Sequence, residues 1–335
     1  MSTLTPPKPD AATAAPARVA LRGAVRVVLR VHRRALWAAG ALMVTGIAVV
    51  VALRVWMASA KELCPDGDIT PCGGPVYQPS YARTSSETFL AEGGTVLLLL
   101  AGLIGVFVAG PLIARELESG TFRLAWAQSV SPAHWLAARL AVPTALAVIG
   151  LTVLIAVYRW GLWALRGYPH SYLTRPYDSG IFPGTGPAVL GYALLAVAVG
   201  ALCAVLVRRT LAAVSLTIVA LGAVGLALAT WRYLLWPPVL RTGPEPVDIG
   251  ANAWDVDMGM ITASGERLYW EDCNSADMTE SVDACMRDRG AVAHFAESHP
   301  LSHYWPLQLV ETGILLALAA LAVFAAFRVL RRLHG

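Results

Sequence analysis

The sequence predicts an all-α membrane protein with six transmembrane helices, and its composition and its long apolar stretches are the observations that predict it. Of 335 residues, 56% are hydrophobic and 14% are charged, and the mean hydropathy is +0.58. Soluble domains carry roughly 25% charged residues. Six stretches are long enough for a bilayer core of about 30 Å, which takes about 20 helical residues. Helices follow because each satisfies its own backbone hydrogen bonds, as lipid requires.

The chain ahead of the first span divides into two segments. Residues 1–17 are rich in Pro, Ala and Thr and have little to bury, so we expect a disordered tail. Over residues 18–34 arginine recurs at every fourth position, which keeps the arginines near one face of an amphipathic helix. We expect this helix to lie in the membrane interface on anionic lipid. The alternative is that the arginines only enforce orientation. They are Arg18, Arg22, Arg26, Arg30 and Arg34.

The remainder, residues 35–335, is expected to form one six-span domain. The predicted spans are Ala35 to Leu53, Gly94 to Ala114, Leu140 to Tyr158, Pro187 to Val207, Leu211 to Trp231 and Gln308 to Phe327. Two of the connecting segments are of special interest, residues 112–139 between spans two and three and residues 237–303 between spans five and six. The second is too small for an independent enzyme core and would need disulfides or packing to stay folded. We interpret it as a cap.

The positive charges give the expected orientation. With the amino terminus inside, the inner segments hold 15 basic residues against three acidic ones, Asp10, Glu116 and Glu118, whereas the rest of the chain holds 11 basic and 19 acidic residues. Positively charged loops tend to remain cytoplasmic. Both termini are therefore expected in the cytoplasm and the cap outside it.

Four of the five cysteines fall in segments predicted to lie outside the cytoplasm, where disulfides persist. Cys64 and Cys72 precede the second span, and Cys273 and Cys285 belong to the cap. Two local bridges are favoured, although four cysteines allow three pairings. A zinc site is the alternative, but neither pair has the Cys-x2-4-Cys spacing of common structural sites.

Few charges fall within the predicted spans. Glu311 and the arginines Arg54, Arg159 and Arg232 lie near their outer ends, where we expect interfacial solvation. His294, His299 and His303 cluster near the end of the cap, but no His-Glu-x-x-His motif is present, so we expect surface histidines and no metal site.

The cytoplasmic connection at residues 112–139 is the most informative stretch. Arg115, Glu116 and Glu118 are expected in a short helix that stops at Gly120, after which Thr121 caps a second helix and Arg123 follows. Ser131 and Pro132 are expected to begin the next helix. Two of the three cytoplasmic acids fall here. From the residues alone, a docking surface and an ordinary helical hairpin are equally good interpretations.

The stretch Arg-Glu-Leu-Glu-Ser-Gly-Thr at 115–121 resembles the permease subunits of type-2 ATP-binding-cassette transporters. In that family a Glu-x-x-x-Gly-Thr element opens the first cytoplasmic loop, and Glu116 with Gly120 and Thr121 matches it. Ser131 fits the turn that follows, and Arg139 stands where lysine is usual. The close match covers about 30 residues. Six spans, an amphipathic first helix and a large outer loop match the family layout more broadly.

The resemblance implies that this loop docks on a separate ATPase subunit. ATP and magnesium would then be bound by that partner, and this chain would carry no cofactor and no catalytic residue. The two lysines, Lys8 before Pro and Lys61 before Glu, leave no Gly-Lys-Ser/Thr phosphate-binding loop here. The docking residues implied are Arg115, Glu116, Glu118, Gly120, Thr121 and Arg123. The resemblance further implies a second permease subunit, an export direction and a bacterial cytoplasmic membrane, and it leaves the cargo residues unknown.

Two other functions remain open from the sequence. One is a membrane sensor or immunity protein without transport, in which the cap binds a ligand. The other is a membrane-embedded lipid-modifying enzyme, although the predicted spans contain no histidine or aspartate to activate their hydroxyl groups. A nucleic-acid binder is disfavoured, because the net charge is only +4 and the basic residues do not gather in one soluble domain.

Overall fold

The computed structural model describes residues 30, 33–59, 81–123, 131–165, 175–273 and 282–332. The expected tail, most of the expected interfacial helix with Arg18, Arg22 and Arg26, and the cysteines Cys64 and Cys72 lie outside these residues. Within them, six helices are long and apolar enough to cross a membrane. The six-span prediction is thus confirmed.

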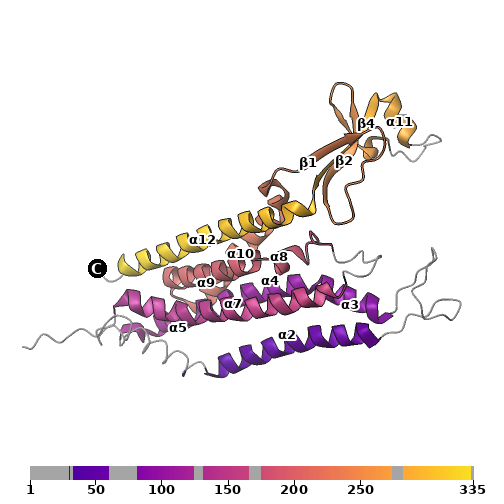
Figure 1. The fold of residues 1–335 in the computed structure, drawn as a ribbon. Helices are drawn as coiled ribbons and strands as arrows, with labels where there is room; N and C mark the ends of the chain where they lie inside the picture. Colours follow the sequence, from indigo (N-terminus) through magenta and orange to yellow (C-terminus); the bar gives the residue numbers. More distant parts are fainter. Residues whose placement is uncertain are drawn as a thin grey trace, which may run out of the picture.

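The first three spans run in alternating directions through the bundle (Figure 1). The first is α2 (Arg33–Ser59). The second is built from α3 (Tyr81–Ala91), α4 (Gly93–Leu103), a π-helical turn η1 (Ile104–Ala109) and α5 (Gly110–Ser119). The third is α7 (Pro132–Trp163). The second span is therefore longer than the predicted Gly94–Ala114 at both ends, and its last part, α5, continues beyond the membrane-crossing stretch that we expected.

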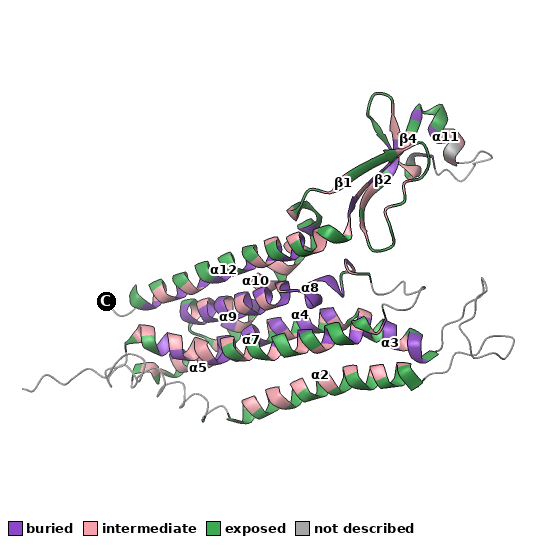
Figure 2. Ribbon diagram, in the orientation of Figure 1, coloured by how far each residue is buried: buried purple, intermediate pink, exposed green. Residues whose placement is uncertain are grey.

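The last three spans follow a short buried helix, α8 (Phe182–Thr185), that packs beside α4. They are α9 (Ala188–Val207), α10 (Thr210–Trp231) and α12 (Tyr304–Arg332). α9 is the central span. Within its apolar stretch of 18 residues 72% is buried, whereas 0% of the corresponding stretch of α2 is buried. Figure 2 shows the same contrast between the buried α9 and the exposed α2 at the edge. α12, α10, α5, α7 and α4 all contact α9.

The segment between α10 and α12 folds largely as a β-sheet, which its sequence pattern did not lead us to expect. A 3-10 turn, η2 (Arg232–Leu235), leads into β1 (Val239–Gly243), β2 (Trp254–Thr262) and β3 (Arg267–Leu268). After η3 (Trp270–Cys273) and α11 (Val282–Asp288) comes β4 (Ala291–His299), and η4 (Leu301–His303) joins it to α12. The order is β1-β4-β2-β3, with every pair antiparallel.

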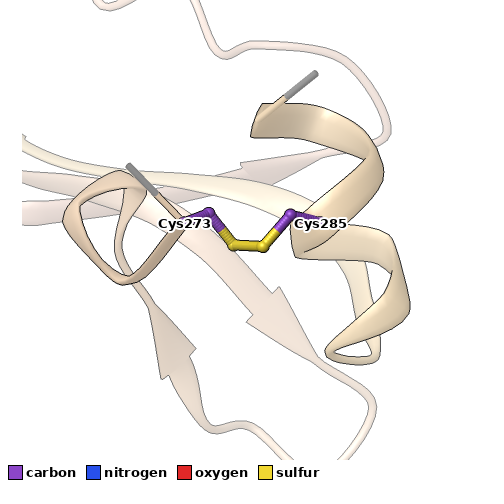
Figure 3. Close-up of a disulfide and its surroundings, with 2 residues drawn as sticks. All are labelled: Cys273 and Cys285. Carbon is purple, nitrogen blue, oxygen red and sulfur yellow. A yellow bond between two sulfur atoms is a disulfide. The ribbon is translucent and has the colours of Figure 1, made fainter. Parts of the chain in front are cut away.

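A disulfide closes the outer part of this cap. Cys273 at the end of η3 is bonded to Cys285 in α11, with their Cα atoms 6.0 Å apart (Figure 3). Both cysteines belong to a small apolar cluster with Met260, Leu268 and Met286. The predicted local bridge is confirmed for this pair, and it supports a segment too small to rely on a large core.

The two ends of the bundle differ. The sheet projects from the end where α10 finishes and α12 begins, whereas α2 begins and α12 finishes at the opposite end, beside α5 (Figure 1). The start of the first span and the end of the last therefore lie on one side.

Candidate functional site

The predicted docking loop begins with α5, an amphipathic helix that starts with Pro111 at its first turn. Ile113, Ala114 and Leu117 are buried against the neighbouring spans, while Arg115 and Glu118 are exposed. α5 contacts α9 and α10 along its buried side. It is therefore a cytoplasmic extension of the second span under the expected orientation, packed firmly on one face and open on the other.

Gly120 ends α5 as the sequence predicted. Its φ of +73° lies in the left-handed region, which glycine adopts without strain. Thr121 Oγ1 donates to the carbonyl of Glu116 at 3.4 Å and lies 3.0 Å from Ser119 Oγ. These contacts occupy polar groups that the helix end leaves unpaired. Arg123 N–H donates to the Gly120 carbonyl at 3.1 Å, and the rest of the predicted second helix, residues 124–130, lies outside the described residues.

Glu116 joins α5 to α7. Its carboxylate forms a salt bridge with Arg139, with 2.7 Å between Oε1 and Nη2 and 3.1 Å between Oε2 and Nε. The indole N–H of Trp135 donates to the same Oε2 at 2.9 Å. All three side chains are buried or partly buried. Glu116 therefore links α5 to α7. Its ion-pair partner is Arg139, the residue at the position where the family that the chain resembles usually has lysine.

Glu118 joins α5 to α10. Its Oε2 accepts the hydroxyl hydrogen of Thr210 at 2.7 Å and the Thr210 backbone N–H at 3.0 Å. Thr210 is the first residue of α10, where backbone N–H groups are unpaired and the helix dipole favours negative charge. Glu118 thus serves as an N-terminal cap supplied from another helix.

The start of α7 follows the predicted pattern. Ser131 is the N-cap, its Oγ accepts from His134 N–H at 3.3 Å, and Pro132 occupies the first helical position. α5 and the first turns of α7 therefore form a hairpin held by Glu116. We call residues Gly110–Arg123 together with Ser131–Arg139 the coupling hairpin.

The predicted docking residues fall into two groups, those that link helices or form the turn and those that are exposed on the outer surface. Glu116 and Glu118 make contacts within the chain, and Gly120 forms the turn. Arg115, Thr121 and Arg123 are exposed on the outer surface. Docking by any of them stays a prediction. Among the described residues, the side chains of Arg115 and Arg123 are available to a partner without breaking a hydrogen bond within the chain, whereas the exposed Thr121 also bonds to the Glu116 carbonyl.

A second polar site lies inside the bundle, and it corrects the expectation of interfacial solvation for two residues. Glu311 of α12 is 0% exposed and Arg232, directly after α10, is 7% exposed. They form a bidentate ion pair at 2.8 and 3.0 Å, and the Tyr192 hydroxyl of α9 donates to Glu311 Oε1 at 2.7 Å. The sequence signal was available, since opposite charges stand at the end of one span and the start of the next.

The other two outer arginines also have protein partners. Arg54 donates to the Trp160 carbonyl at 2.8 Å and stacks 4.0 Å from the centre of its ring. Arg159 donates to the Thr185 carbonyl in α8 at 3.1 Å. Partial exposure agrees with contact to headgroups, but both side chains also hold neighbouring segments together.

The histidines near the end of the cap behave differently from the prediction. His299 is fully buried, so the expectation of a surface residue is wrong for it. Its Nε2–H donates to the Tyr233 carbonyl at 3.0 Å, which leaves its Nδ1 to accept from His303 Nδ1–H at 3.2 Å. Burial lowers the pKa of His299. Among the described residues no group of three or more metal-binding side chains occurs.

Comparison with known proteins identifies a family for this chain. Residues 38–232 match the model of the family described as ABC-2 membrane transporter related. No curated protein and no solved structure matches the chain. The match covers the first five spans and the coupling hairpin, which is more than half of the chain. The six apolar helices that the structure contains agree with it, and the chain belongs to the ABC-2 membrane transporter related family.

Proposed function

We propose that this chain is the permease subunit of an ATP-binding-cassette exporter, driven by a separate ATPase subunit that docks on the coupling hairpin. The observation that carries the proposal is the way α5 is tied to its surroundings. Glu116 binds α7 and Glu118 binds α10, while α5 itself continues the second span. A displacement of this hairpin by a partner would therefore be transmitted to three spans.

The proposal assigns each docking residue a role. Arg115, Thr121 and Arg123 are exposed and would contact the ATPase. Glu116 and Glu118 would transmit the force rather than receive it, and Gly120 would shape the turn. Because the sequence has no phosphate-binding loop, ATP and magnesium would be bound by the partner.

The expected orientation places the coupling hairpin in the cytoplasm and the cap outside a bacterial cytoplasmic membrane. A second permease subunit, either the same chain or a related one, would complete the pathway. The cargo would be apolar or amphipathic, since few charged side chains line the spans.

The test uses charge reversal at the exposed arginines, Arg115→Glu with Arg123→Glu. The tagged chain is purified from its native membranes in mild detergent, and the ATPase that co-purifies is identified by mass spectrometry and assayed. We expect a stoichiometric P-loop ATPase with the unmodified chain and at least a tenfold smaller amount with the variant, which corresponds to about 1.4 kcal/mol.

The matched control is Arg287→Glu with Arg289→Glu, which reverses two exposed arginines near α11 in the cap. This control should retain the ATPase. An ATPase that stays bound when Arg115 and Arg123 are reversed would contradict docking at this surface. Absence of any ATPase even after gentle cross-linking would contradict the transporter function and favour the sensor or the enzyme.

A further inference from the structure

A groove of about 540 Å³ runs along α7 and faces α12. Its wall on α7 is a single helix face between Ala137 and Ile149, on which residues recur at steps of three and four. Ala137, Ala141 and Ala145 contribute small side chains to it, and Phe327 of α12 borders it. We call this hollow the α7–α12 groove. Its volume is within the usual range of about 300–1,000 Å³ for ligand sites.

A second hollow of about 400 Å³ shares Phe327 and opens onto three arginines. The described part of its lining comes entirely from the end of α12. We call its charged residues, Arg328, Arg331 and Arg332, the arginine mouth, and all three are exposed. The described lining of both hollows contains no acidic side chain.

The depth of the two hollows follows from helix geometry. From Trp305 the apolar part of α12 takes about 20 residues to cross the hydrocarbon, so the arginine mouth lies just beyond it, at headgroup level. The lining of α7 from Ala137 to Ile149 covers about 18 Å at 1.5 Å per residue. That is close to half of a bilayer core of about 30 Å. The groove therefore has about the length of one leaflet, and Phe327, which borders it, also borders the arginine mouth.

We propose that the α7–α12 groove and the arginine mouth together bind one anionic phospholipid. An acyl chain would lie along the alanines of α7, and the phosphate would contact the arginine mouth. Charge complementarity selects the occupant, because three cations with no acidic side chain among the described lining residues favour an anionic headgroup. The apolar groove beside them selects a lipid over a free phosphate. The proposal depends only on insertion in the membrane and not on the ATPase.

The experiment measures lipid binding to the purified full chain by native mass spectrometry. The probes are dioleoyl phosphatidylglycerol and, for comparison, dioleoyl phosphatidylcholine. Arg328→Gln with Arg331→Gln should weaken phosphatidylglycerol binding roughly thirtyfold and leave phosphatidylcholine unchanged, because each arginine near an anionic surface contributes about a factor of five. The control, Arg208→Gln with Arg209→Gln, removes two exposed arginines between α9 and α10 and should bind as the unmodified chain does.

A second variant tests the groove independently of charge. Ala145→Phe fills the groove and should abolish specific binding of both lipids, whereas Ala156→Phe, at an exposed alanine of α7 outside the groove, should not. Phosphatidylglycerol preference that survives loss of Arg328 and Arg331, or falls equally in the control, would overturn the proposal. So would competition by glycerol 1-phosphate at lipid concentrations. Conversion of a dimer to a monomer by Ala145→Phe, without loss of lipid, would identify the groove as a protein interface instead.

Discussion

At the scale of residues, the ion pair of Arg232 and Glu311 is the most demanding arrangement in the bundle. Each charge loses its hydration on burial. The bidentate contact between Arg232 and Glu311 offsets this cost, together with the hydrogen bond that the Tyr192 hydroxyl donates to Glu311. Arg232 follows α10 and Glu311 lies near the start of α12. The pair therefore fixes the two points from which the cap extends.

Removal of one partner should cost more than removal of both. Glu311→Leu leaves a buried guanidinium without its counter-charge, and we expect a loss of about 3–5 kcal/mol in the free energy of unfolding. The double variant Arg232→Met with Glu311→Leu should recover most of that loss, because neither charge is then buried. Thermal or denaturant unfolding of the detergent-purified chain measures both. A double variant less stable than Glu311→Leu would contradict a coupled pair.

At the scale of elements, the contact between η1 and α9 depends on two glycines. A Cβ on Gly105 would stand 2.3 Å from the backbone of Ala196, and one on Gly200 would stand 2.6 Å from the carbonyl oxygen of Gly105. Backbone lies on both sides, so no side chain can move aside. Small residues allow such close approach between helices in membranes, and a π-helical turn such as η1 is the kind of irregularity that re-aims one helix against another.

We expect Gly200→Ala to destabilise the chain by about 1–3 kcal/mol, since α9 must move away from η1. Gly225→Ala in α10 is the matched control, because no atom lies within 4 Å of its added Cβ. Its effect should be neutral or stabilising by up to about 1 kcal/mol, through the higher helix propensity of alanine. The measurement is the unfolding midpoint of each variant. Equal midpoints would contradict the expectation, because they would show that α9 moves away from η1 without a loss of stability.

At the scale of the whole molecule, the two ends of the bundle have different chemistry. One end carries the coupling hairpin and the arginine mouth, and the other carries a disulfide-bonded sheet (Figure 1). A disulfide requires an oxidising compartment, whereas arginine-rich ends stay in the cytoplasm. This contrast supports the proposed orientation, in which the arginine-rich end lies in the cytoplasm and the sheet lies outside it.

Thiol labelling of intact cells tests this orientation. A membrane-impermeant maleimide should leave Cys273 and Cys285 unlabelled until a reductant is added, after which peptide mass spectrometry should find both modified. A cysteine introduced by Arg332→Cys at the other end should react only once the membrane is permeabilised. Labelling of that cysteine in intact cells would show that the chain has the opposite orientation. Labelling of Cys273 without reductant would show that the disulfide is not formed in the cell.

The sequence by itself determined the spans and the local signals at their ends. In lipid, a continuous apolar run of about 20 residues indicates a helix, because barrel strands are about half as long and alternate in polarity, so the apolar runs were sufficient to predict six spans. Gly120, Ser131 and Pro132 act on groups within a few residues of themselves, which explains why their roles were readable. The nearby pair Cys273 and Cys285 belongs to the same category, with 12 residues between its members.

Only the tertiary structure decided which polar side chains meet. Glu118 and Thr210 are separated by 92 positions, and Arg232 and Glu311 by 79. The short-range periodicity of the sequence cannot predict pairs so far apart along the chain. Which side chains meet depends on how the helices pack and not on local propensity. The sheet of the cap was missed for a related reason: its central pair joins β2 to β4 across a long connection. The resemblance implied that Glu116 and Glu118 are docking residues, and the structure adds that both carboxylates also bond to other helices of the chain.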